Sequence, residues 1–127
     1  MAEVVLDASA LLALLNAEPG SEAVSAALPG AAMSSVNYSE VVARLSDSGL
    51  PPKEIRLALD GLGLDVLGFD EEQAFAAGLL RPATRAAGLG LGDRACLSLG
   101  ALHSKPVLTA DRAWQGLKLN VEVRMVR

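Results

Sequence analysis

Four acidic residues differ from the other acids of this sequence because their neighbours are apolar or small. Asp7 follows three apolar residues, and Asp111 follows the segment VLTA at 107–110. Asp93 precedes a long apolar stretch, and Glu40 stands beside two valines. Ligands of open α/β sheets bind beyond the carboxyl ends of the strands, which is where Asp7 and Asp111 are expected. We therefore predict that the four side chains can converge on one crevice.

A cluster of four carboxylates is unfavourable unless a cation neutralises it. Two unit charges about 4 Å apart repel by roughly 4 kcal/mol at an effective dielectric of about 20. Several such pairs would strain a domain whose total stability is about 5–15 kcal/mol. Oxygen ligands favour Mg²⁺ or Mn²⁺, and a chain with one histidine and one cysteine does not suggest zinc. A divalent cation held by acids can polarise a phosphoryl oxygen and activate water, so the pattern indicates phosphodiester chemistry.

Each of the four acids also has an ordinary structural interpretation. Asp7, Asp93 and Asp111 each stand where a helix or turn is expected to begin, and an acid there contributes about 1 kcal/mol as a cap or first-turn residue. Glu40 could pair with Arg44, which lies four residues later on the same expected helix. Spacing alone leaves both interpretations open.

An alternation of strand and helix patterns must position these acids. Short apolar or small-residue runs predict strands at residues 3–6, 31–35, 65–69, 106–109 and 121–126. Helical spacing and terminal signals predict helices at 9–15, 19–28, 36–48, 51–62, 71–87 and 94–103, with a kink or break near Pro82 and a loop at 88–92. Strands separated by helices predict an α/β fold with a mostly parallel central sheet flanked by helices on both faces. We expect residues 1–127 to form one domain.

Composition and charge narrow the class of protein. Of the 127 residues, 51% are hydrophobic and only 3% aromatic, which suits a core of Leu, Val and Ala between helices and a parallel sheet. A single cysteine excludes a disulfide within the chain. The N-terminus lacks the features of a signal peptide, and no apolar run is long enough to span a bilayer, so we expect a cytoplasmic protein. A net charge of −4 argues against binding nucleic acid over the whole surface, although a cation in an acidic pocket can still meet a phosphate.

Four segments resemble the acidic motifs of PIN-domain nucleases, especially the VapC-type toxins of bacterial toxin–antitoxin pairs. They are VLDASALL at 5–12, NYSEV at 37–41, LGDRACL at 91–97 and VLTADRAW at 107–114, in the order of the family. The resemblance covers essentially the whole chain and implies a PIN fold with Mg²⁺- or Mn²⁺-dependent endonucleolytic cleavage of RNA. The implied reaction is in-line attack of an activated water on a phosphodiester, which leaves 5′-phosphate and 3′-hydroxyl ends.

The resemblance also implies roles for individual side chains. The catalytic, metal-binding carboxylates would be Asp7, Asp93 and Asp111, and Glu40 would complete the pocket as a ligand or through a water. The polar residues that would orient ligands or water are Ser9, Asn37 and Thr109.

Partners and substrate contacts follow from the same resemblance. Toxins of this type are usually homodimers held inactive by a small antitoxin, whose C-terminal segment covers the active site. Arg94 and Arg112 are candidate RNA contacts. Arg94 replaces the small residue common in the family, so it could instead form a salt bridge with the acids or cover the surface.

Three other functions explain fewer features of the sequence than a metal-dependent nuclease does. A receiver-like signalling module would need a second acid near Asp7 and a phosphoacceptor at the end of a central strand, but Asp65 begins its strand. An aspartyl phosphatase would need an acid two residues after Asp7, where Ser9 stands. The stronger alternative is a PIN-like module that acts chiefly through a complex with antitoxin and DNA and has little nuclease activity. We interpret Cys96 and His103 as structural.

Overall fold

The centre of the molecule is a sheet of short parallel strands. The computed structural model describes residues 3–127. Its strands are β1 (Val4–Leu6), β2 (Ala31–Ser34), β3 (Asp65–Leu67), β4 (Val107–Thr109) and β5 (Val123–Met125). They pair in the order β3-β2-β1-β4-β5, and every neighbouring pair is parallel. β1 and β4 are therefore neighbours, and their carboxyl ends meet at the same edge of the sheet.

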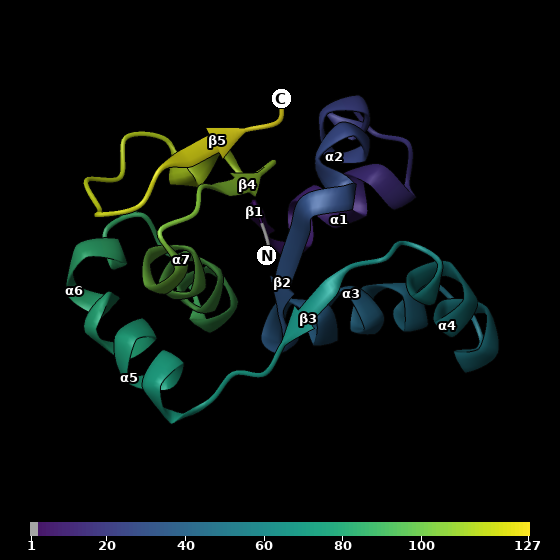
Figure 1. Ribbon diagram of the computed structural model, residues 1–127, viewed down its shortest axis with the longest axis horizontal. Coiled ribbons are helices and arrows are strands. Elements are labelled where there is room, and N and C mark those ends of the chain that lie inside the picture. Colours follow the sequence, from purple (N-terminus) through teal and green to yellow (C-terminus); the bar gives the residue numbers. More distant parts are fainter. Residues whose placement is uncertain (1–2) are drawn as a thin grey trace.

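Helices cover both faces of this sheet. They are α1 (Ala8–Leu15), α2 (Ser21–Ala27), α3 (Ser35–Asp47), α4 (Pro52–Asp60), α5 (Glu71–Leu79), α6 (Arg81–Thr84) and α7 (Leu91–His103), with short 3₁₀ turns η1 (Leu28–Gly30) and η2 (Arg112–Trp114). In Figure 1, α1 to α4 lie on one side of the strands, and α5, α6 and α7 lie on the other. The predicted α/β class is confirmed. Among residues 3–127, no helix is long and apolar enough to cross a membrane.

Each face of the sheet has its own hydrophobic cluster. Side chains alternate between faces along β1, so Val4 and Leu6 pack on one side and Val5 on the other. The first cluster joins β1 to the helices α1 to α4 through buried residues such as Leu11 and Val41. The second cluster joins it to α7 and includes the buried Trp114 ring. Burial on both faces holds β1 in place, and β1 is the strand that ends at the first acid of the predicted site.

The start of α7 differs from the sequence prediction. The helix begins at Leu91 instead of residue 94, so the last two residues of the expected loop at 88–92 belong to its first turn. The N–H of Gly90 donates to Oδ2 of Asp93 at 3.0 Å, which closes this end of the helix. The prediction is wrong here because three glycines within five residues are typical of a loop, whereas Gly90 is the N-cap of α7.

Other boundaries differ for local reasons. The break predicted near Pro82 is confirmed, because the helix expected over 71–87 divides at Leu80 into α5 and α6. The end of α6 at Thr84 is three residues earlier than predicted. Pro82 has no N–H and its ring excludes the preceding helical turn, so α5 cannot continue through it. Each strand is shorter by one to three residues than predicted, because pairing in the sheet ends before the extended sequence pattern does.

Gly100 is a packing glycine, and its replacement should lower stability. A Cβ built at Gly100 would lie 2.5 Å from Cγ1 of Val107 and 3.0 Å from the carbonyl oxygen of Lys105. We expect Gly100→Ala to lower the free energy of unfolding by about 1–2 kcal/mol, because overpacking outweighs the gain in helix propensity. Urea unfolding of Gly100→Ala against Gly78→Ala measures this, since a Cβ at Gly78 on α5 would meet nothing within 4 Å. Equal stability of the two variants would contradict the prediction.

Candidate active site

Asp7 is buried where β1 passes into α1. Its side chain is 3% exposed, and Oδ1 accepts the N–H of Ala10 at 2.8 Å, so Asp7 caps α1. The Ser9 hydroxyl lies 2.8 Å from Oδ1 and 2.9 Å from Oδ2, and the Thr109 hydroxyl donates to Oδ2 at 2.6 Å. Asp7 is therefore both a helix cap and part of a polar network that joins α1 to β4.

The two hydroxyls beside Asp7 are held in one orientation. Ser9 Oγ accepts the backbone N–H of Ala110 at 2.9 Å, and Thr109 Oγ1 accepts that of Asp111 at 3.0 Å. A hydroxyl has a single proton to donate. Each hydroxyl accepts one backbone N–H and donates to the Asp7 carboxylate, and the two hydroxyl oxygens lie 3.2 Å apart. The network thus holds this carboxylate at a defined position before any ligand arrives.

Burial nevertheless makes the charge on Asp7 unfavourable. Desolvation raises the pKa of Asp7 from its ordinary value of 3.8 to about 6. The hydrogen bonds from Thr109, Ala10 and Ser9 lower it, and the nearby carboxylate of Asp93 raises it again. A buried acid with a raised pKa beside a second acid is typical of a functional site.

Asp93 and Asp111 are each held through one oxygen. Oδ2 of Asp93 accepts the N–H of Gly90 at 3.0 Å, in the first turn of α7. Oδ1 of Asp111 accepts the N–H of Ala113 at 2.9 Å and caps η2. The second oxygen of each carboxylate accepts no hydrogen bond from any residue in the described range 3–127. The capping roles considered from the sequence are real, and they leave one oxygen of each acid available.

The pKa of Asp93 reports its surroundings. Burial raises it, and the carboxylate of Asp111 raises it further, while the Gly90 N–H, the Trp114 indole and the Arg94 guanidinium lower it. Nε1 of Trp114 is buried without a hydrogen-bond partner among the described residues, so its influence on Asp93 is that of a nearby dipole rather than of a formed bond. Asp7, Asp93 and Asp111 therefore form a series of like charges that influence one another.

Glu40 reaches the same region from α3. Its side chain is exposed, and its Oε1 accepts Nδ2 of Asn37 at 2.9 Å. The same Nδ2 also donates to the carbonyl oxygen of Gly92 at 2.9 Å, so Asn37 joins α3 to α7. The alternative pairing of Glu40 with Arg44 is not seen, because no salt bridge involving either residue occurs within residues 3–127.

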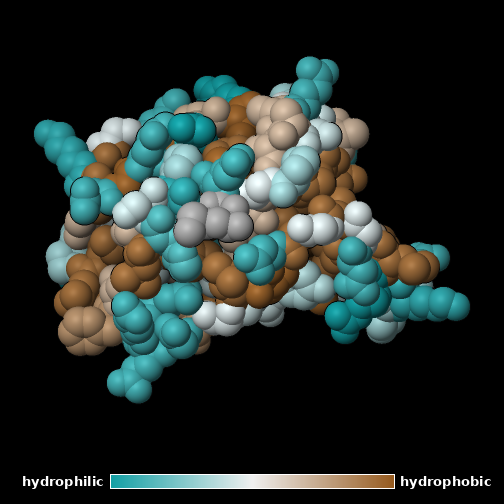
Figure 2. All heavy atoms as spheres, viewed as in Figure 1, coloured by the Kyte–Doolittle hydropathy of each residue, from teal (hydrophilic) through white to brown (hydrophobic). Residues whose placement is uncertain are grey.

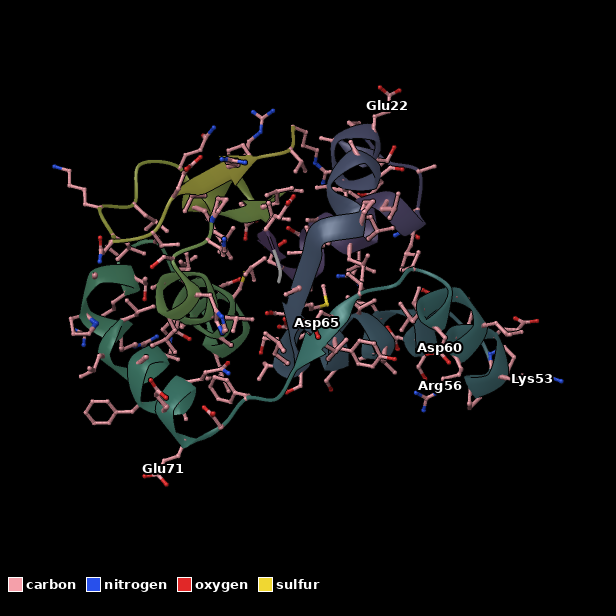
Figure 3. All side chains as sticks on the ribbon, in the orientation of Figure 1. Glu22, Lys53, Arg56, Asp60, Asp65 and Glu71 are labelled. Carbon is pink, nitrogen blue, oxygen red and sulfur yellow. The ribbon has the colours of Figure 1, made fainter. Side chains whose placement is uncertain are left out.

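All four predicted carboxylates line one cavity. It has a volume of about 410 Å³ and is lined by Asp7, Ala8, Ser9, Leu12, Glu40, Ala43, Arg44, Asp93 and Asp111. Other acids lie elsewhere: Glu22, Asp60 and Glu71 project from α2, α4 and α5 at the periphery of the molecule (Figure 3). The four residues selected from the sequence thus line one cavity, and these three peripheral acids do not.

The side chains that line the cavity are of the types that bind hard cations, but they are not arranged around a common point. Its charged donors are carboxylate oxygens, which suit Mg²⁺ or Mn²⁺, and neither His103 nor Cys96 lines it. In the part of the chain that the structure describes, no three His, Cys, Asp or Glu side chains are already arranged to hold a metal ion. Asp93 and Asp111 each keep one oxygen that is not used by its capping bond. The donor set of the cavity therefore fits a divalent cation by its chemistry.

Two features of the cavity were not recognised from the sequence. Arg44 lines it, although it was considered only as a partner for Glu40. Its spacing of four residues from Glu40, which places both on one helix face, was the available signal. Arg94, a candidate RNA contact, donates Nη1 to the carbonyl oxygen of Ala77 at 3.2 Å and so contacts the end of α5. Arg112 is exposed on η2.

The family of the chain follows from its sequence as a whole. The sequence model of the PIN domain matches residues 4–118, which include all four carboxylates. The chain belongs to the PIN-domain family. No curated protein sequence is significantly similar to it.

Solved structures with the same fold extend over nearly all of this PIN domain. A toxin–antitoxin complex from Klebsiella pneumoniae is 20% identical, with a TM-score of 0.77 over 98% of both chains. DNA-bound VapBC from Salmonella typhimurium is 18% identical, with a TM-score of 0.77 over 100% of both chains. FitAcB from Neisseria gonorrhoeae is 24% identical, with a TM-score of 0.66 over 94% of this chain and 95% of the other. At these identities the likeness establishes the PIN fold.

Proposed function

We propose that this PIN domain is a divalent-cation-dependent endoribonuclease and the toxin of a toxin–antitoxin pair. PIN domains are generally nucleases. The observation that carries the proposal is one cavity of about 410 Å³ lined by four carboxylates from four separate elements, with Asp7 buried among them. Caps explain why an acid stands at each of three helix or turn starts, but they do not require these acids to line the same cavity as Glu40.

The carboxylates would hold the cation in this mechanism. Asp7, Asp93 and Asp111 are the proposed ligands, and Glu40 completes the pocket directly or through a water. When bound, Mg²⁺ or Mn²⁺ would neutralise the acids, polarise a phosphoryl oxygen and lower the pKa of a water molecule. Hydrolysis then forms a bond from the water oxygen to phosphorus and breaks the bond to the 3′ oxygen, which takes up a proton. The expected ends are a 5′-phosphate and a 3′-hydroxyl.

Neutral polar residues would keep the acids in place during this reaction. Ser9 and Thr109 direct their hydroxyl protons to Asp7, and Asn37 holds one oxygen of Glu40. Hydrogen bonds of this kind preserve the positions of carboxylates that would otherwise move apart by repulsion.

Arginines near the cavity would meet the RNA backbone. A chain with a net charge of −4 cannot attract RNA over its whole surface. Arg44 lines the cavity and forms no ion pair with its acids in the described residues, so its guanidinium is available to a phosphate. Arg112 on η2 is a second candidate. Arg94 is a weaker one, because one of its nitrogens is used by Ala77 and Nε is buried.

The proposed partners are an antitoxin protein and a second copy of the chain. Among solved structures with this fold, one is described as a toxin–antitoxin complex and another as a member of the VapBC family of toxin–antitoxin systems. Two VapBC structures and one FitAB structure are described as bound to DNA. Hydrophobic side chains reach the surface in the region of α5 (Figure 2), where Phe75 is 70% and Leu79 is 66% exposed. These two residues lie four positions apart on one helix face, which supports a homodimer. A single-domain toxin that cleaves cellular RNA would act in the cytoplasm.

RNA cleavage by the purified protein tests the proposal. We expect the chain, freed of any co-purified partner, to cut RNA internally with Mg²⁺ or Mn²⁺, to stop when EDTA is added, and to resume when the cation is restored in excess. Sequencing the product ends should give 5′-phosphates and 3′-hydroxyls. Cleavage that continues in EDTA would contradict the proposed chemistry. Absence of cleavage with every cation, together with tight binding to an antitoxin and its DNA, would favour the binding-only alternative.

A further inference from the structure

We propose that Gly92 is a positioning residue, because the space left by its missing side chain is the place where the Glu40 carboxylate rests. The inference rests on the proposed function, in which Glu40 completes the cation pocket, and it adds a residue to the machinery of that pocket. Gly92 stands directly before Asp93, so this placement brings the Glu40 carboxylate against the backbone that carries another acid of the site.

The evidence is what a Cβ at Gly92 would meet. Its three nearest neighbours would all be atoms of the Glu40 carboxyl group, namely Oε2, Cδ and Oε1, and all would be closer than real Cβ contacts allow. No such atom belongs to the backbone or to a core side chain. The group that would have to move first is therefore the flexible end of the Glu40 side chain.

The local backbone gives no other reason for glycine at this position. Gly92 is the second residue of α7, and its φ lies outside the left-handed region. Alanine would be preferred there on helix propensity alone. Gly100, on the same helix, is different, because a Cβ there would collide with Val107 and a backbone carbonyl. Gly92 therefore serves the Glu40 carboxylate rather than the packing of α7.

Asn37 holds the carboxylate in this space. Its Nδ2 lies 2.9 Å from both Oε1 of Glu40 and the carbonyl oxygen of Gly92. Because Nδ2 donates to two oxygens, the orientation of the Asn37 amide is determined. A reversed amide would place Oδ1 against Oε1 of Glu40 and the carbonyl oxygen of Gly92. The side chain is 1% exposed, and Oδ1 is buried without a hydrogen-bond partner among the described residues. An unsatisfied buried oxygen is unfavourable, and its presence indicates that the two contacts of Nδ2 are required.

Gly92→Ala should therefore impair cleavage without harming the fold. We expect cleavage about 10- to 100-fold slower than wild type, the range typical of residues that position a metal ligand. Gly78→Ala is the matched control, since it makes the same change within a helix where a Cβ meets nothing within 4 Å. In a Glu40→Ala background, Gly92→Ala should cause no further loss. Wild-type cleavage by Gly92→Ala, or an equal loss in both backgrounds, would overturn the inference.

A stability cycle gives a readout that does not depend on activity. The thermal midpoint of unfolding is measured in EDTA for wild type, Gly92→Ala, Glu40→Ala and the double variant. We expect Gly92→Ala to raise the midpoint more in the Glu40→Ala background than in wild type, because the displaced carboxylate is then absent. Equal shifts in the two backgrounds would overturn the inference. If wild type cuts no RNA with any cation, the proposed function fails, and this cycle alone decides whether Gly92 positions Glu40.

Discussion

Replacing Asp7 by asparagine is expected to slow RNA cleavage by at least about 1000-fold. Asp7 is the most buried of the four acids, and three donors hold its carboxylate at one position. Losing one charge of the pocket removes several kcal/mol of electrostatic stabilisation, and about 4 kcal/mol corresponds to a factor of about 1000 in rate. Asparagine is itself a good N-cap, so the hydrogen bond from Ala10 that begins α1 can be retained. The loss should therefore be one of chemistry and not of folding.

Single-turnover cleavage of a defined RNA measures this effect, with Asp65→Asn as the control. Asp65, labelled on β3 in Figure 3, is an exposed acid on the edge strand and does not line the cavity. Its replacement by asparagine makes the same change in net charge. The control should cut at the wild-type rate. Activity of Asp7→Asn within tenfold of wild type, with a normal unfolding transition, would contradict the assignment of Asp7 to the site.

The metal-free protein is expected to lose stability as the pH rises, in contrast to ordinary acid denaturation. The unfolded chain releases the Asp7 proton near its ordinary pKa of 3.8, whereas burial raises the pKa in the folded protein to about 6. The folded state therefore binds more protons between these values, and the free energy of unfolding falls through this range. A difference of about 2 pKa units corresponds to about 3 kcal/mol, present below about pH 4 and lost above about pH 6. A bound divalent cation would offset this loss.

Urea unfolding in EDTA at about pH 4 and about pH 7 tests the pH dependence. Other carboxylates titrate in the same range, so the informative quantity is the difference between wild type and Asp7→Asn. The free energy of unfolding of wild type minus that of Asp7→Asn is measured at each pH. This difference should fall by about 3 kcal/mol from the lower pH to the higher one. A difference that is the same at both pH values would mean that burial does not perturb Asp7 in the free protein.

The positions of the acids were predictable because the signals are local. Asp7 and Asp111 follow apolar runs that form β1 and β4, and Asp93 lies in the first turn of a helix that is apolar on most sides. These patterns depend only on alternation, caps and helix periodicity, which neighbouring residues determine. The capping interpretation of each acid was also correct. The cap occupies one oxygen of Asp93 and of Asp111 and leaves the other available, so the two interpretations do not exclude one another.

The parts that were not predictable depend on contacts between distant segments. The hydroxyl of Thr109 is directed at Asp7 because β4 pairs with β1, and Arg94 turns to Ala77 because α5 packs on α7. The start of α7 was missed because a glycine N-cap cannot be told from a loop glycine by its type. Gly92 was placed in a loop for the same reason, although its role appears only when α3 brings Glu40 against it.

For this protein, the sequence by itself determined the α/β class, the order of strands and helices along the chain, and the four acids, three at the ends of these elements and Glu40 within α3. The tertiary structure decided which strands are neighbours, which oxygen of each acid remains free, and which glycine accommodates a carboxylate. The physical reason is range: caps and periodicity act over about four residues. Desolvation of Asp7, repulsion between Asp93 and Asp111, and the contact of Glu40 with Gly92 arise only when segments far apart in the chain meet.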